Sequence, residues 1–381
     1  MELKYEKKDV YSKLSKDELK NVDEYAISFM KFLNTAKTER ICVREALIML
    51  KAQGFVDISE KENLKLGDKV YFVNKNKSLY VAIIGKNSLK HGINIVGAHI
   101  DSPRLDLKPM PLFEKHNAAL LKTQYYGGIK KYQWMSIPLA MYGVVFNEKG
   151  EKIDIAVGDV DDDITFTITD LLPHLAKDQM KANANDFIDP EKMSVIVGSI
   201  KDDKAKSDKV KENILKILNE KYGIKEIDFA RSEIEFVPAF KAKYVGLDKS
   251  MIGGYGQDDR VCSYSTIRAL IDISKENKEL NKTAVAMIVD KEEIGSFGNT
   301  SMTSETFDMF IEKLISMTSD KDVSKSELYY NSSMLSADVS TCVDPEWDEV
   351  SDVQNGNILG CGIALEKYTG SGGKYNSSDA N

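Results

Sequence analysis

The sequence has few cysteines and no long apolar run. Its four cysteines (Cys42, Cys262, Cys342 and Cys361) are widely separated and form no Cys-x-x-Cys pair. This spacing argues against a disulfide framework and a cysteine-type structural zinc site, and it favours reduced thiols in a cytoplasmic protein. No apolar stretch is long enough to span a bilayer, and the first residues lack the apolar core of a signal peptide.

The chain also lacks an excess of positive charge. It carries 52 Lys and Arg against 60 Asp and Glu, a net charge of −8. We therefore expect neither a nucleic-acid partner nor a membrane partner. The composition, with 42% hydrophobic and 29% charged residues, is that of a globular protein, and 381 residues predict two domains.

Strand and helix patterns alternate in the first and last thirds of the chain. Ser15 and Glu18 form a capping box before a helical stripe, and residues 38–52 predict a second helix. The expected strands are residues 70–73 and 79–84 as a hairpin, 93–96, 283–289, 332–337 and 357–365. These patterns predict an α/β fold in which helices cover a mixed sheet.

The sequence pattern changes in the middle third of the chain, where strand and helix patterns no longer alternate. From about residue 105 the chain contains short β-like runs at 118–126, 132–135 and 139–146, and it is expected to return to its first layer around 233–239. We therefore predict that residues 1–104 and 236–381 form one domain. Residues 105–235 then form a β-rich domain inserted into it.

Residues 97–103 (Gly-Ala-His-Ile-Asp-Ser-Pro) follow the apolar strand 93–96. His99 and Asp101 are therefore expected at the carboxyl end of a strand, where α/β sheets bind their ligands. A metal-binding imidazole usually donates its other ring N–H to a carboxylate, and Asp101 lies close enough in sequence to accept it. The alternative is a polar loop without a ligand.

Other acidic residues stand at equivalent places, at predicted strand ends or at a helix start: Glu292 and Glu293, Asp338, and Asp258 and Asp259. Parallel strands would bring these groups to one edge of the sheet, where they would repel each other unless cations lay between them. Imidazole and carboxylate ligands suit zinc, with manganese and cobalt as alternatives. Two metal ions bridged by one carboxylate would satisfy this ligand set.

The two carboxylates of the pair Glu292-Glu293 can have different roles. Neighbouring residues at a strand end point in different directions, so one carboxylate can bind metal while the other faces the polarised water. The alternative is a pair of solvated surface charges. The apolar residues 285–289 before the pair and Ile294-Gly295-Ser296 after it favour the first interpretation.

In their order along the chain, these motifs resemble the M18 metallopeptidases, the group similar to aspartyl aminopeptidases. The matching segments are residues 97–103, 258–259, 290–296 and 336–338, with residues 126–134 (Tyr-Gly-Gly-Ile-Lys-Lys-Tyr-Gln-Trp) similar to the bacterial branch. The resemblance implies a dinuclear, zinc-type site in the catalytic α/β domain. The implied metal ligands are His99, Asp258 as the bridge, Glu293 and Asp338. It also implies that Glu292 is the general base and that Asp101 supports His99.

The resemblance further implies a metal-dependent aminopeptidase that acts on peptide N-termini and assembles into tetrahedral dodecamers through the inserted domain. His174 would reach the active site of a neighbouring subunit, whereas His91 and His116 have no implied role. Two alternatives stay open: an M42-type dinuclear hydrolase, and a catalytically silent assembly subunit of the same fold. Metal content separates the silent subunit from the enzyme.

The preferred first residue of the peptide is not fixed by the sequence. An acidic residue, Asp or Glu, would need a basic pocket, and Arg260 and Lys374 lie near the matching motifs. The resemblance also implies one more histidine ligand beyond the segment that matches residues 374–381. Since His174 is the last histidine, we expect a chain truncated at its C-terminus, with one weakened metal site and low activity.

Overall fold

The computed structural model describes residues 3–159, 161–276, 278–369 and 376–378. It divides into a larger unit, Met30–Ala337, and a smaller unit that combines Met1–Phe29 with Asp338–Asn381. Helix α1 (Lys16–Thr35) contains the boundary between residues 29 and 30. None of the helices in the described part of the chain has the length and apolar character needed to cross a bilayer.

A six-stranded mixed sheet forms the first layer of the larger unit. In spatial order its strands are β1 (Val56–Asp57), β2 (Lys69–Asn74), β3 (Ser78–Ile83), β13 (Ala284–Val289), β4 (Asn94–His99) and β14 (Ser333–Ser336). β4 pairs in parallel with both β13 and β14, and the register places His99 opposite Val289. The carboxyl ends of these three strands therefore lie at one edge of the sheet, as predicted from the sequence.

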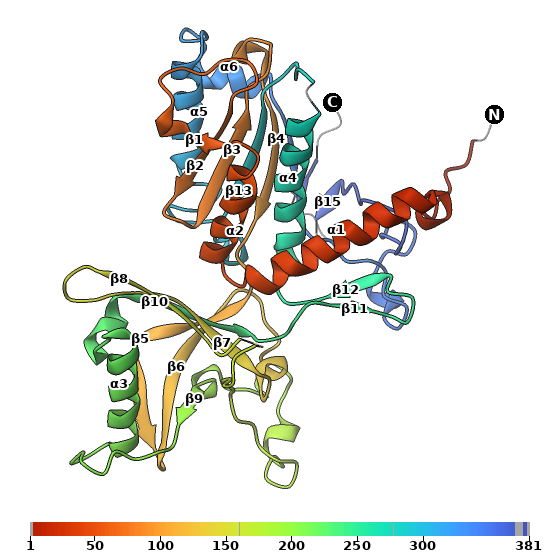
Figure 1. Ribbon diagram of the computed structural model, residues 1–381. Coiled ribbons are helices and arrows are strands. Elements are labelled where there is room, and N and C mark those ends of the chain that lie inside the picture. The colour runs from red at the N-terminus through yellow and green to blue at the C-terminus, as the bar shows by residue number, and fades with distance from the viewer. Residues whose placement is uncertain (1–2, 160, 277, 370–375, 379–381) are drawn as a thin grey trace. The chain divides into compact units, whose positions relative to one another are not determined.

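Helices cover both faces of this sheet (Figure 1). They are α2 (Glu39–Lys51), α4 (Gln257–Lys275), α5 (Thr306–Met317) and α6 (Lys325–Tyr330). On one face, Phe307 and Phe310 of α5 pack against Tyr80 of β3, with ring centroids 5.2 and 5.7 Å from the tyrosine ring. On the other face, α4 contacts β4 and β13. Buried on both faces, the central strands have the continuous apolar sequences expected of parallel strands.

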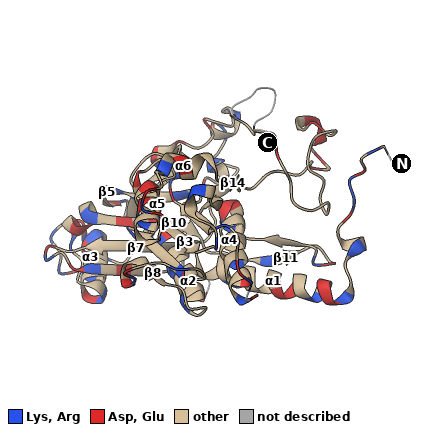
Figure 2. Cartoon of the chain, turned by 90° about the horizontal axis from the view of Figure 1, so that it is seen from above, with Lys and Arg blue, Asp and Glu red and all other residues tan. Residues whose placement is uncertain are grey.

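The second sheet of the larger unit is antiparallel. In spatial order its strands are β8 (Lys152–Val157), β7 (Leu139–Phe146), β10 (Ser232–Pro238), β5 (Arg104–Lys115), β6 (Ala118–Tyr126) and β9 (Val195–Gly198). Helix α3 (Lys209–Tyr222) packs Val210 and Ile214 onto the core of this sheet. Its basic and acidic residues are interspersed along its length (Figure 2), so the apolar residues that repeat at helical spacing fix its buried face.

Short elements connect these layers within the larger unit. A separate hairpin is formed by β11 (Lys243–Val245) and β12 (Met251–Gly253). The 3-10 helices are η2 (Ile58–Glu60), η3 (Leu89–His91), η4 (Lys131–Trp134), η5 (Gln179–Lys181), η6 (Pro190–Lys192), η7 (Glu226–Arg231) and η8 (Glu292–Ile294).

Three local predictions from the sequence are wrong. β10 covers the residues where the chain was expected to rejoin the first layer, yet it pairs with β5 and β7 of the second sheet. Residues 132–135 lie largely in the 3-10 helix η4 and not in a strand. Residues 357–365 form only an isolated bridge at Asn357, because Gly360 and Gly362 adopt positive φ angles of 78° and 95° that interrupt an extended chain.

In the smaller unit, the predicted capping box is present. The Glu18 carboxylate accepts the Ser15 N–H at 2.8 Å, and the Ser15 hydroxyl accepts the Glu18 N–H at 3.3 Å. The remaining elements of this unit are η1 (Tyr11–Lys13), η9 (Asp348–Val350) and the paired strands β15 (Tyr368–Thr369) and β16 (Asn376–Ser377). Lys374 and residues 379–381 lie outside the described residues.

Candidate metal centre

The predicted cluster forms where β4 and β13 end. His99 is the last residue of β4, and the chain after β13 continues through Asp290 into η8, which begins at Glu292. Asp258 lies in the first turn of α4, and its backbone carbonyl accepts the Ser102 hydroxyl at 2.6 Å. Parallel pairing thus brings together residues that are far apart in the sequence.

The His99 imidazole is buried, with 3% of the residue exposed. Its Nδ1 lies 3.2 Å from Asp101 Oδ1 and 3.1 Å from the Asp101 carbonyl oxygen. Its Nε2 lies 3.2 Å from Asp258 Oδ1 and 3.7 Å from Glu292 Oε2. Acceptors therefore lie on both sides of the ring; with the proton of a neutral ring on Nδ1, that N–H donates to Asp101 and the Nε2 lone pair is available to a metal ion.

Asp101 is fully buried, and its carboxylate accepts hydrogen bonds from several segments of the chain. Oδ1 accepts the backbone N–H of Glu292 at 3.2 Å, and Oδ2 accepts the backbone N–H of Glu293 at 3.2 Å and the Tyr126 hydroxyl at 2.7 Å. Burial alone would raise the pKa of Asp101, but the hydrogen bonds from His99 and Tyr126 hold this pKa below its ordinary value. The group is therefore an ionised acceptor.

The neighbouring residues Asp258 and Asp259 contact different parts of His99. The Asp258 side chain is 55% exposed and faces His99 Nε2, whereas Asp259 is fully buried and its Oδ2 accepts the His99 backbone N–H at 3.4 Å. Ser263 of α4 donates its hydroxyl to the His99 carbonyl at 2.5 Å. One acid thus faces the site while its neighbour helps to fix the strand that carries His99.

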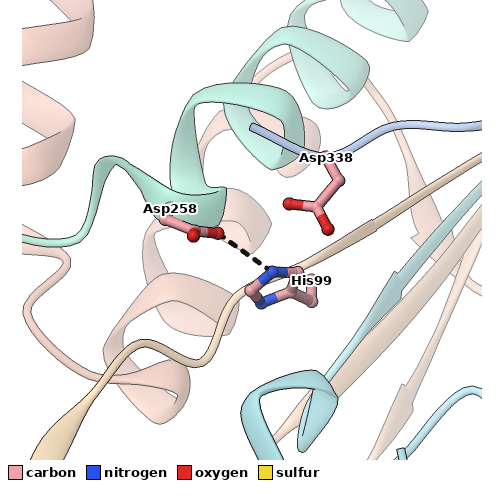
Figure 3. Close-up of side chains that lie close together, drawn as sticks. All are labelled: His99, Asp258 and Asp338. Atoms are coloured by element: carbon pink, nitrogen blue, oxygen red, sulfur yellow. Dashed lines mark ion pairs between the residues drawn. The ribbon is translucent and has the colours of Figure 1, made fainter. Parts of the chain in front are cut away.

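Asp338 follows Ala337, whose N–H donates to the Gly97 carbonyl of β4 at 2.8 Å. Asp338 thus lies two residues beyond Ser336, the last residue of β14. His99, Asp258 and Asp338 each offer one ligand atom, and these atoms lie within 4.8 Å of one another (Figure 3). One imidazole nitrogen and two carboxylate oxygens at this spacing fit a zinc-type ion.

Glu293 lies beside this group but is not among its three residues. Burial, followed by the nearby Asp258 carboxylate, raises the pKa of Glu293 to about 7. The carboxylates of Glu293 and Asp258 repel each other when both are ionised, and a cation between them would relieve that repulsion. The donor set of the structure therefore fits a divalent metal ion.

The other predicted residues have different surroundings. His174 is exposed in a turn beside the exposed Leu172 and Leu175, and it is not one of the three clustered residues His99, Asp258 and Asp338. His91 ends η3, and His116 occupies the β5–β6 turn with a φ of 49°.

Arg260 corrects the expectation of a basic substrate pocket. It is only 1% exposed, and its Nε donates to the Ile100 carbonyl at 3.2 Å. Its guanidinium therefore belongs to the protein interior and not to a pocket that a substrate carboxylate can enter. The second candidate, Lys374, lies outside the described residues.

Sequence reasoning missed Tyr126, Ser102 and Ser263 as parts of this site. Tyr126 and Ser263 approach His99 and Asp101 only when distant segments pair. Asp259 was among the acids expected at this edge, but its hydrogen bond to the His99 backbone was not predicted.

Comparison with known proteins identifies the family. Residues 32–381 match the family model described as aminopeptidase I zinc metalloprotease (M18). A probable M18 family aminopeptidase 1 from Clostridium acetobutylicum is 45% identical over 383 residues, which cover 99% of this chain and 81% of that protein. The crystal structure of an M18 aminopeptidase from Thermotoga maritima superimposes with a TM-score of 0.92 at 42% identity, covering 99% of this chain and 82% of that one.

A more distant structure, that of a yeast mApe1 dodecamer, has a TM-score of 0.71 at 21% sequence identity. The superposition covers 89% of this chain and 76% of the mApe1 chain. That likeness supports the fold alone. The family itself is shown by the family model, which matches residues 32–381, and by the Clostridium relative at 45% identity. The chain therefore belongs to the M18 family of zinc aminopeptidases.

Proposed function

We propose that this chain removes single residues from the N-termini of peptides by metal-dependent hydrolysis at the His99 cluster. The observation that carries this proposal is the arrangement of His99, with Nδ1 held by Asp101 and Nε2 facing Asp258 and Glu292. An imidazole fixed in this way is suited to bind a metal ion. The M18 match favours this reaction over that of an M42-type hydrolase.

Within this proposal, His99, Asp258, Glu293 and Asp338 would hold two divalent ions, most simply zinc, and Asp258 would contribute to both. His99, Asp258 and Asp338 already have ligand atoms close together, and the raised pKa of Glu293 indicates unrelieved negative charge beside them. When bound, such ions polarise a peptide carbonyl and lower the pKa of water.

Glu292 is the proposed general base. Its side chain is 46% exposed, so a substrate and a water molecule can reach the carboxylate. Its backbone N–H is tied to Asp101, which limits how far the carboxylate can move. The carboxylate would accept a proton from the attacking water and deliver it to the departing amine nitrogen, so that atoms and charge balance when the peptide bond breaks.

We further propose that the chain works as a homo-oligomer, and specifically as a dodecamer. The structurally similar yeast mApe1 is described as a dodecamer. The exposed side chains of Leu171, Leu172 and Leu175 around His174 support an interface in this region. His174 would then reach the site of a neighbouring subunit. A cytoplasmic location fits the four thiols, which form no disulfide in the described structure.

The test is peptide hydrolysis by the purified chain before and after chelation and addition of Zn²⁺, Mn²⁺ or Co²⁺. Peptides that begin with Leu, Met, Asp or Glu would be compared with N-acetylated copies of the same peptides. We expect metal-dependent release of the first residue from the unblocked peptides only. Cleavage of the blocked copies would contradict the aminopeptidase proposal. Tight metal binding without turnover would contradict it as well, and little bound metal would favour the silent assembly subunit.

A further inference from the structure

We propose that Tyr126, which belongs to the second sheet, is a positioning residue for the His99 site and acts through Asp101. This inference rests on the proposed function only in taking His99 as a metal ligand. Tyr126 is the last residue of β6, whereas His99 ends β4 of the first sheet. The second sheet would thus contribute to the geometry of the site, in addition to any part it has in assembly.

Of the four contacts of the Asp101 carboxylate described above, the one with the Tyr126 hydroxyl is the shortest. The distance of 2.7 Å between Tyr126 Oη and Asp101 Oδ2 compares with 3.2 Å for the His99 ring and for each of the two backbone N–H groups. A short O–H···O⁻ bond between buried groups is a strong, charge-assisted one. Burial and the adjacent Asp101 carboxylate raise the pKa of Tyr126 above its ordinary value, so the hydroxyl stays protonated and donates.

The face of the Tyr126 ring contacts Arg104. Arg104 pairs with Tyr126 across β5 and β6, and its guanidinium carbon lies 3.8 Å from the centre of the tyrosine ring. This is a cation–π contact between two buried side chains. Arg104 is itself fixed by carboxylates, with Nη1 3.5 Å from Glu39 and Nε 3.4 Å from Glu235. A run of contacts therefore leads from α2 and β10 to Asp101.

This arrangement restricts the orientation of the Asp101 carboxylate. Because Tyr126 holds Oδ2, Oδ1 must face His99 Nδ1 and the backbone N–H of Glu292. Rotation of the carboxylate would break the short bond to Tyr126. The hydroxyl thus helps to fix the tautomer of His99 and the position of the segment that carries Glu292, two properties that metal binding requires.

Tyr126→Phe tests this role, because it removes the hydroxyl and keeps the ring against Arg104. Tyr125→Phe is the matched control, since the neighbouring Tyr125 is 39% exposed. We expect the zinc affinity of Tyr126→Phe, measured by competition with a chelator, to fall about 10-fold, the lower end of the range for such partners of metal ligands. The visible spectrum of the Co²⁺-loaded protein should also change. Tyr125→Phe should match the wild type in both measurements.

A double-mutant cycle separates action through Asp101 from a general structural effect. In an Asp101→Ala background no side-chain partner remains for the Tyr126 hydroxyl, so Tyr126→Phe should cause little further loss of zinc affinity. An equal loss in both backgrounds would overturn the proposed route through Asp101. Unchanged zinc affinity in Tyr126→Phe alone would overturn the proposal altogether.

A measurement on the metal-free protein keeps this inference distinct from the proposed function. The chain has four histidines, so selective ¹⁵N labelling of histidine gives a small set of ring signals. We expect the His99 Nδ1 signal to be that of a protonated nitrogen in the wild type and in Tyr125→Phe, and to move toward that of an unprotonated nitrogen in Tyr126→Phe. Identical His99 signals in all three proteins would refute the role of Tyr126. Failure to cleave peptides would refute the proposed function and leave these signals unaffected.

Discussion

Replacing Asp101 by Asn should destabilise the segment that carries Glu292, and the expected size follows from the contacts of the carboxylate. Each oxygen of Asp101 faces two donors: Oδ1 faces the His99 ring N–H and the Glu292 N–H, and Oδ2 faces the Tyr126 hydroxyl and the Glu293 N–H. An amide has only one acceptor oxygen. In either orientation its NH₂ group therefore lies against two donors.

The smaller loss occurs when the NH₂ group faces Tyr126, because the hydroxyl can turn and accept a hydrogen bond from it. The Glu293 N–H then still loses its acceptor. A hydrogen bond to a charged group contributes about 1.5–3 kcal/mol, so we expect a loss of at least about 1.5 kcal/mol. Local opening should consequently increase by about 10-fold or more, since 1.36 kcal/mol corresponds to a factor of ten.

Native-state hydrogen exchange at the Glu292 and Glu293 amides measures this opening directly. Asp248→Asn is the matched control, because it removes the same charge from an exposed turn where the Asp248 carboxylate accepts hydrogen bonds from the neighbouring Ser250. Exchange at both amides should be faster in Asp101→Asn and unchanged in Asp248→Asn. Equal exchange rates in the two variants would refute the view that Asp101 anchors this segment.

Three further outcomes are expected. Glu292→Gln should lower turnover by about 10²–10⁴-fold, the usual contribution of a general base, while metal content stays near that of the wild type; a near-normal rate would refute this role for Glu292. His174→Ala should lose activity without losing metal, and mixed oligomers with Glu292→Gln should regain part of it if two chains form each site. Burial lowers the pKa of Lys37 from 10.5 to about 8, so the unfolded state binds more protons between these values and the free energy of unfolding should rise with pH from 8 to 10.5. Lys37→Met should flatten this rise in urea titrations, and an unchanged slope would contradict the shift.

The strands that could be predicted from the sequence are those with a continuous run of apolar residues. β13 and β4 were expected from buried runs that end in polar residues, and the structure pairs them in parallel with His99 opposite Val289. The acids after these strands consequently meet at one edge, as predicted. The metal-binding and catalytic roles assigned to them, and the division into a catalytic and an inserted domain, stay predictions.

The missed features depend on pairing that no local pattern reveals. The alternation of apolar residues in β10 shows which side chains are buried but not which sheet the strand joins. Arg260 has the sequence context of a surface residue on a helix, yet its partner is the Ile100 carbonyl, 160 residues away. Tyr126 precedes Gly127-Gly128 and was recognised only as part of a family motif, because its bond to Asp101 forms only when β6 folds onto β5.

The central claim is that His99 holds the metal ion on which peptide hydrolysis depends. The most direct measurement is turnover of an unblocked leucyl peptide while the metal-free chain is titrated with Zn²⁺, for the wild type, His99→Ala and the matched control His116→Ala. We expect the wild type and His116→Ala to regain activity at the same zinc concentration and His99→Ala to stay inactive. Recovery of His99→Ala at that zinc concentration, or a wild type that does not respond to zinc, would contradict the account.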